Sequence, residues 1–421
     1  MKGKNLGKKR IPRKRQPNAS EPTALTRRPH PLPEPSVQVS APGVPFGVGD
    51  ALSGMMSPFD LTPQDRKTIY RFMVDFSDVM YPSHFYASAR ELPSVFFNYM
   101  FVDEAYFHGF IAMTAAFSDF ITGQHTRTAS NAHHLGLALR LTNARLSGSD
   151  ALSDTTLASV IALCLFENMT GDVEKMAMHF DGLCRMIALR SGVKTNLTLL
   201  EKARRLDIDL ALQTGQPLRL DFEPVPDICY PFSLSCDLPP PLDQSLREAD
   251  LGLYLVTRDV MKMTRLLSLG VAPVKPTLQE AITALFYRLL SIDTIAGGHL
   301  QEPLARTVHT ILLAVMTTSI IQFDRQRCIK YGLLSRQCAA RLNDSRFLAT
   351  MATNPEDHIW MLIVAESAIL SPEEDVWLIP RIHEIACRLG ISEWSEAKML
   401  LEKYPWIPSL HEKPAMLLWG R

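Results

Sequence analysis

Apolar residues recur along most of the chain at intervals of three or four positions, which is the spacing of an α-helix. The first such stripe consists of Leu135, Leu139, Thr142 and Leu146. A wider stripe follows at Leu157, Val160, Ile161, Cys164 and Leu165, and a third at Met176, Phe180, Leu183 and Ile187. Short polar turns join these segments, which favours antiparallel packing of neighbours. The pattern predicts an all-α fold, a large helical domain of packed antiparallel helices.

The ends of several helices are also marked. Thr62 followed by Pro63 is typical of an N-cap and a first helical position, so we expect the first helix to begin there. Ser153 or Asp154 can cap the helix that holds the second stripe, and Gly171 can end it. The domain therefore starts near residue 61.

Residues 1–60 differ from the rest, since they hold ten of the 29 prolines and no helical pattern. Proline lacks a backbone donor, and we expect a disordered, basic, Pro-rich tail. Lys+Arg and Asp+Glu balance at 44 each, yet residues 1–30 carry ten bases and one acid. Six of these bases form a cluster: Lys8, Lys9, Arg10, Arg13, Lys14 and Arg15.

Clustered basic charge on a flexible tail suits the acidic groove of a nuclear import receptor, or phosphates. We interpret the six bases as a nuclear-targeting signal; direct nucleic-acid contact and a merely solvated tail remain the alternatives. Any binding to nucleic acid through this tail should be weak, sensitive to salt and independent of sequence.

Residues 61–421 are expected to form one helical domain, with possible halves at 61–215 and 246–421. The intervening Pro-rich segment, 215–245, reads as an extended linker that lies across the helical body. Helices should resume near Leu246, with breaks near Gly270–Pro276 and at Asn354-Pro355.

Composition argues against several other classes of protein. The seven cysteines are scattered, as in a reducing compartment, and we expect no signal peptide. The most apolar run, Val308 to Ile321, falls short of the roughly 18 residues needed to span a bilayer, so we expect no membrane contact. Possible metal ligands occur in three pairs: Cys229 with Cys236, His133 with His134, and His383 with Cys387. Because none has a second pair nearby, we expect no metal and no cofactor.

The sequence holds no phosphate-binding Gly-rich loop and no His-Glu-x-x-His pattern, and we assign no catalytic residue. One segment, from His179 to Gly192, begins within the helix expected at Val173 to Leu189 and carries a more informative motif. Its residues are His179, Gly182, Leu183, Arg185, Arg190 and Gly192. In structural terms, Gly182 should allow a close crossing with the 157–165 helix, and Arg190 should pair near the helix C-terminus.

This motif resembles one found in the fungal-specific transcription factor domain, with Ser191 in place of the first of two glycines. Segments 138–143, 153–158, 205–211 and 215–217 are similar to the family in the same order. Five spaced tryptophans add to the resemblance: Trp360, Trp377, Trp394, Trp406 and Trp419. We expect these large rings at helix packing points.

The resemblance implies transcriptional regulation in the nucleus, through a domain that responds to a small molecule or a partner protein. It also implies a transcription factor or coactivator as partner, or a homo- or heterodimer. The family normally begins with a six-cysteine zinc cluster, whereas the first cysteine here is Cys164. Either the protein works without reading DNA itself, or an exon is missing. A helical small-molecule carrier, an enzyme without a recognisable motif and a nonfunctional remnant are the alternatives.

Overall fold

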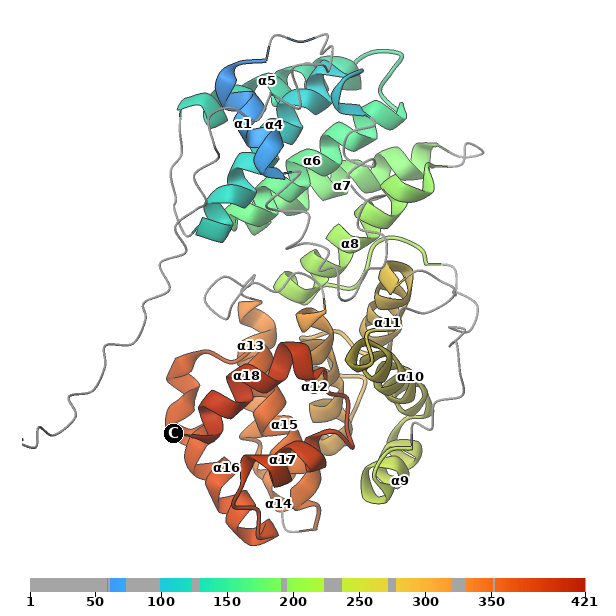
Figure 1. The fold of residues 1–421 in the computed structure, drawn as a ribbon. Helices are drawn as coiled ribbons and strands as arrows, with labels where there is room; N and C mark the ends of the chain where they lie inside the picture. Colours follow the sequence, from blue (N-terminus) through green and yellow to red (C-terminus); the bar gives the residue numbers. More distant parts are fainter. Residues whose placement is uncertain are drawn as a thin grey trace, which may run out of the picture. The chain divides into compact units, whose positions relative to one another are not determined.

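The computed structural model describes residues 59, 61–72, 99–122, 129–190, 195–222, 237–271, 278–319, 331–350 and 353–420. These residues form sixteen α-helices and one short 3-10 helix, with no strand among them (Figure 1). The predicted all-α fold is confirmed. Apart from Phe59, the expected tail at 1–60 lies outside the described residues, and so do its six clustered bases.

The N-terminal helices are α1 (Pro63–Arg71), α4 (Glu104–Thr122), α5 (Ala129–Leu146), α6 (Asp154–Thr170), α7 (Val173–Leu189) and α8 (Leu197–Thr214). Their ends follow the predicted caps. Thr62 accepts a hydrogen bond from the Asp65 backbone at 3.2 Å, and α1 begins at Pro63. Ser153 caps α6, and Gly171 ends it with φ of 77°.

The C-terminal helices are α9 (Pro240–Ala249), α10 (Leu251–Ser268), α11 (Leu278–Ile292), α12 (Pro303–Thr318), α13 (Gly332–Leu342), α14 (Ser345–Ala349), α15 (Pro355–Ala368), α16 (Asp375–Leu389), α17 (Trp394–Leu401) and α18 (Pro408–Trp419), with the 3-10 helix η4 (Pro372–Glu374) before α16. Both predicted breaks are confirmed, since α10 ends before Gly270 and α15 begins at Pro355.

The predicted restart of helix near Leu246 is wrong, because α9 already begins at Pro240. Prolines 239–241 were expected to belong to the linker. In the first turn of a helix the backbone N–H groups have no partner within the helix, so proline loses no hydrogen bond there. Prolines 239–241, which were expected to belong to the linker, can therefore lie at the start of α9.

Buried apolar residues form two clusters, which we call the first and second cores. The first core takes its residues from α1, α4, α6, α7 and α8, and the second core from α8 to α18. Helix α8 therefore contributes to both. The suggested halves, 61–215 and 246–421, stay a prediction.

The first core depends on a close helix crossing at Gly109 of α4. A Cβ atom placed there would lie 3.3 Å from the Ala162 Cβ on α6 and 3.9 Å from the Ala138 Cβ on α5. The helix predicted from the stripe in α5 is confirmed, although Thr142 is the only fully buried member of that stripe. The buried face of α5 consists of His134, Ala138 and Thr142, whereas its leucines are half-buried or exposed. At the crossing itself, the small side chain of Ala138 faces Gly109 of α4.

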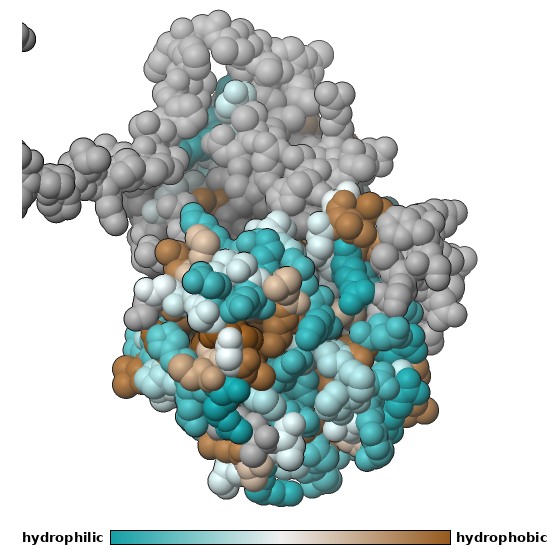
Figure 2. Space-filling view, turned by 60° about the horizontal axis from the view of Figure 1, so that its bottom comes forward, coloured by the Kyte–Doolittle hydropathy of each residue, from teal (hydrophilic) through white to brown (hydrophobic). Residues whose placement is uncertain are grey.

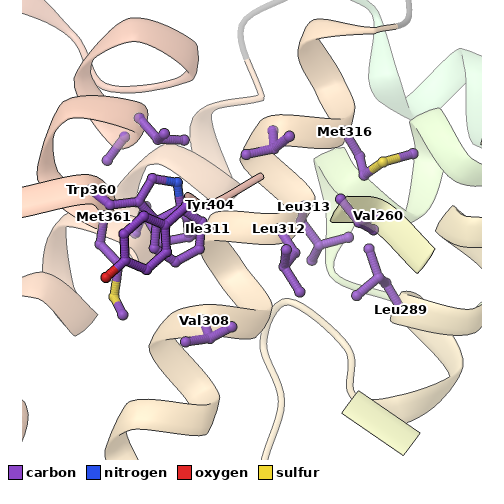
Figure 3. Packing of buried hydrophobic residues seen from close by; sticks show 14 of the residues in the cluster. Val260, Leu289, Val308, Ile311, Leu312, Leu313, Met316, Trp360, Met361 and Tyr404 are labelled. Carbon is purple, nitrogen blue, oxygen red and sulfur yellow. The ribbon is translucent and has the colours of Figure 1, made fainter. Parts of the chain in front are cut away.

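The second core is organised around α12. Every residue from Leu304 to Thr318 except Arg306 is buried, so this helix is covered on all sides. Figure 3 shows Trp360, Met361 and Tyr404 against one side of α12, and Val260 and Leu289 against the other. The most apolar run of the sequence, Val308 to Ile321, lies largely in α12. No helix in the described parts of the chain has the length and apolar character to span a bilayer.

Tryptophans lie at packing points of the second core, as expected. The Trp360 ring stacks on Tyr404 with centroids 4.9 Å apart, and its Nε1 donates to the Pro405 carbonyl at 3.2 Å. Trp394 of α17 and Trp419 of α18 meet edge to face at 6.1 Å. The coloured part of the surface visible in Figure 2 is largely hydrophilic, with apolar residues interspersed.

We predict that Gly109→Leu destabilises the fold by about 1–3 kcal/mol, because the side chain overpacks the crossing with α6. The matched control is Gly136→Leu on α5, where a Cβ meets nothing within 4 Å. That change should be neutral or stabilising by up to about 1 kcal/mol through helix propensity. Thermal unfolding of the two variants measures the difference, and equal melting temperatures would contradict the crossing.

Candidate functional site

Helix α8 is the element that the two cores share. Every residue from Leu206 to Leu212 is buried, which leaves this part of the helix no solvent-facing side. Leu206 and Leu210 belong to the first core, and Ile208 and Leu212 to the second. Two carboxylates lie within the same buried stretch, at positions 207 and 209. Such groups are stable in an interior only when hydrogen bonds satisfy them.

Asp207 receives its hydrogen bonds from the chain that follows α8 and from α11. The backbone N–H groups of Arg219 and Leu220 donate to its carboxylate at 3.0 and 2.9 Å. The Tyr287 hydroxyl of α11 donates at 2.9 Å. Phe222 stacks on the Tyr287 ring with centroids 4.6 Å apart. The described start of the predicted linker, residues 215–222, is thus held against the helical body.

Asp209 receives its hydrogen bonds from both sides of α8. Asn168 of α6 donates through Nδ2 at 3.2 Å, and the Tyr331 hydroxyl, at the start of α13, donates at 2.7 Å. Arg205, one turn earlier on α8, lies 3.8 Å away through its Nε atom. The Asn168 carbonyl oxygen in turn accepts from Gln213 at 2.9 Å. A hydrogen-bonded chain therefore runs from α6 through α8 to α13.

Burial dominates the protonation chemistry of this junction. It raises the pKa of Asp207 and of Asp209, although their hydrogen bonds oppose the shift. Burial and the Asp207 charge also raise the pKa of the Tyr287 hydroxyl, so this group remains a donor. Both aspartates accept hydrogen bonds from donors on different elements. Loss of any one of these donors would leave a buried carboxylate without one of its partners.

Gly215 allows α8 to end against the second core. Its φ of 72° lies in the left-handed region, and an added Cβ would lie 2.8 Å from Leu333 and 3.2 Å from Ala296. Only glycine combines this conformation with so close an approach. The chain can consequently turn back over α8 and reach Asp207.

The predicted family motif lies on α7, and its residues have different surroundings. Leu183 is buried in the first core. Arg190 caps α7, and its Nη1 donates to Asp154 at 2.6 Å, which confirms the predicted pairing at the helix end. His179 is half-buried, and its pKa is lowered by burial and by the charge of Lys175. Gly192 lies outside the described residues.

The predicted packing role of Gly182 is wrong. A Cβ placed on Gly182 would meet nothing within 4 Å, so no helix crosses α7 there. Arg185, one turn further along the helix, is exposed. The close crossing of the first core lies at Gly109 instead. Spacing along one helix cannot reveal which of its glycines another backbone approaches, because that choice depends on the partner helix.

The two aspartates of α8 were not predicted as functional residues from the sequence, although they lie in the family-like segment 205–211. The available signal was two acids inside the run Leu206–Leu212, which is otherwise apolar. The structure also connects this junction to α7, since Arg219 forms an ion pair with Asp181 of α7.

A second buried polar cluster involves His134 of α5. Its Nδ1 lies 2.8 Å from the Nδ1 of His108, and its Nε2 lies 3.1 Å from the Asp65 carboxylate. Burial lowers the pKa of His108 to about 4. His133 is exposed, and its ring meets that of His134 edge to face with centroids 5.8 Å apart. Within the described ranges, no group of three or more His, Cys, Asp or Glu side chains could hold a metal ion.

Comparison with protein families places the α7 motif in a known domain. Residues 71–210 match the fungal specific transcription factor domain. The match covers about a third of the chain, and its described part holds α4 to α7 and most of α8. The resemblance inferred from the motif is confirmed for this segment. No curated protein and no solved structure matches the chain.

We predict that Tyr287→Phe destabilises the protein by about 1–3 kcal/mol, because Asp207 loses a donor while the ring keeps its packing. The matched control is Tyr254→Phe, since the Tyr254 hydroxyl is buried without a hydrogen-bond partner. Its removal should be neutral or slightly stabilising. Urea unfolding of both variants tests this, and a Tyr287→Phe variant as stable as wild type would show that the hydroxyl contributes nothing.

We predict that Asp209→Asn becomes more stable relative to wild type as pH rises. The ordinary pKa of 3.8 is raised in the folded protein, so the folded state favours the protonated carboxyl. This contribution is complete below the ordinary pKa and is lost as pH rises through the folded-state pKa. Asparagine does not titrate. The contributions of all other titratable groups cancel when the unfolding free energy of one chain is subtracted from that of the other. Unfolding free energies of the two chains, measured between about pH 4 and pH 7, should diverge; a constant difference contradicts the raised pKa.

Proposed function

We propose that this chain is a transcriptional regulator, starting from the match of residues 71–210 to the fungal specific transcription factor domain. This match is the observation that carries the proposal. It is supported by the position of the matched segment, which contains most of the first core and ends within the buried stretch of α8.

The proposed mechanism uses α8 to connect the two cores. A small molecule or partner protein acts on such a domain only if it binds two states of it with different affinity. Helix α8 suits this role because its aspartates take hydrogen bonds from α6, α11 and the start of α13. A signal received on one core would shift α8 and break or exchange these bonds, which changes the surface of the other core.

We further propose that a transcription factor or coactivator partner supplies sequence-specific DNA recognition. The seven cysteines of the 421 residues are scattered, and of the four that the structure describes, Cys164 and Cys338 are buried. The basic tail would add weak binding to nucleic acid, and its cluster from Lys8 to Arg15 would direct the protein to the nucleus through an import receptor.

We predict that the full chain, fused to a DNA-binding domain that lacks an import signal, enters the nucleus and changes transcription of a reporter. Replacing Lys8, Lys9, Arg10, Arg13, Lys14 and Arg15 by Ala should leave the fusion in the cytoplasm and abolish the effect. Adding a foreign import signal should restore it. A fusion that is nuclear yet leaves the reporter unchanged contradicts the regulatory function, and an alanine variant that stays nuclear contradicts the targeting role.

A further inference from the structure

The polar cluster of the first core joins three helices through two histidine rings. His134 of α5 lies between Asp65 of α1 and His108 of α4, with its Nε2 3.1 Å from the Asp65 carboxylate and its Nδ1 2.8 Å from the His108 Nδ1. The Asp65 side chain is 2% exposed, and those of His134 and His108 are 8% and 13% exposed. The three groups therefore interact with one another largely out of contact with water.

The distances determine where the protons of this cluster lie at neutral pH. The Asp65 oxygen that faces His134 is buried and has no other partner among the described residues, so the His134 Nε2 carries a proton toward it. In a neutral ring the other nitrogen is an acceptor, and the His108 Nδ1 must then carry the proton that lies between the two rings. The His108 Nε2 remains a lone pair, 4.0 Å from Glu104.

The contact between the two rings limits how many protons they hold together. If both rings were charged, each Nδ1 would carry a proton, and two donors would face each other across 2.8 Å. The pair therefore does not become doubly charged while the rings stay in contact. Once the rings are separated and solvated, both take up protons near their ordinary pKa of 6.5.

We propose that Asp65, His134 and His108 form a proton-operated latch, which holds α1 against α4 and α5 at neutral pH and releases α1 when both rings are protonated. Asp65 is fixed to α1 by the capping box, in which the Thr62 backbone N–H donates to its carboxylate at 3.0 Å. At the other end of α1, Phe72 contacts an aromatic ring of α4 edge to face at 4.9 Å. Release of α1 consequently uncovers apolar residues of α4.

The surroundings of the rings favour release on acidification. Among the described residues, the other charged or titratable groups that face the rings are Asp65 of α1, Glu104 of α4, and His133 and Arg140 of α5. The two acids favour a positive charge on His108, and the two bases oppose it. Burial has the largest effect, and it lowers the pKa of His108 to about 4 and that of His134 in the same direction.

The number of protons sets the size of the effect. The closed latch binds at least one proton fewer than the open latch once the pH falls below the ordinary pKa of 6.5. Its stability is thus complete above that pKa and is lost as pH falls, and the opening constant should rise about tenfold or more between pH 6 and pH 5. This inference goes beyond the proposed regulatory function: hydrogen exchange tests the latch, whereas the reporter tests regulation.

Hydrogen exchange of the full chain over a pH series tests the proposal, with exchange times scaled for the effect of pH on the intrinsic rate. In wild type, the amides of α1 should lose protection by about tenfold or more between pH 6 and pH 5. The matched control is His133→Asn, which removes an exposed histidine next to His134 and keeps the latch. This variant should lose protection as wild type does.

The informative variant is His108→Asn. Its side-chain amide takes the place of Nδ1 and turns either its NH₂ group or its carbonyl oxygen toward His134, so His134 binds a proton without losing the contact. The loss of α1 protection between pH 6 and pH 5 should therefore fall to about threefold or less.

NMR titration of the histidine rings in wild type gives a check that does not depend on the folding of a variant. His108 and His134 should not both become charged while α1 stays protected. Two rings that titrate together near their ordinary pKa of 6.5 with α1 still protected overturn the proposal. So does a wild-type α1 that is equally protected at both pH values, and so does a His108→Asn variant as sensitive to pH as wild type.

Discussion

The rest of the structure depends on the burial of α8 between two cores. A surface helix keeps one polar side toward water, but the stretch from Leu206 to Leu212 has none. The carboxylates of Asp207 and Asp209 therefore need donors from the protein, and these come from α6, α11, the start of α13 and the segment after Gly215. Satisfying two buried acids holds these elements in place around one helix.

A buried polar network of this kind favours one arrangement of the helices over others. Apolar contacts between α8 and its neighbours tolerate small shifts, because they have no directional requirement. Hydrogen bonds to Asp207 and Asp209 do not tolerate such shifts, because a shift that breaks one of them leaves a charge in an apolar interior. In the proposed regulatory function, such a junction would favour a choice between distinct arrangements over gradual deformation.

Glycines show how function and packing can be confused at the level of sequence. Gly109, Gly182 and Gly215 lie in or at the end of helices, yet only the first and third are approached closely by other parts of the chain. Gly182 belongs to the motif that points to the family, and its open surroundings mean that intrachain packing does not account for it.

Sequence by itself determined the features that depend on neighbours along the chain. Local hydrogen bonding and dihedral preference determine the bounds of three helices. These are α7 from Val173 to Leu189, α6 with its cap at Ser153 and its end at Gly171, and α1 with its start at Pro63. The family match rests on the same linear order.

Only the tertiary structure decided which face of each helix is buried. The buried face of α5 consists of His134, Ala138 and Thr142 rather than its leucines, and Gly109 brings α4 close to Ala138. Two aspartates of α8 lie in the interior, where tyrosines more than 70 positions away donate hydrogen bonds to them. Periodicity fixes where a helix runs, whereas burial depends on which distant surface packs against it, and no local pattern encodes that partner.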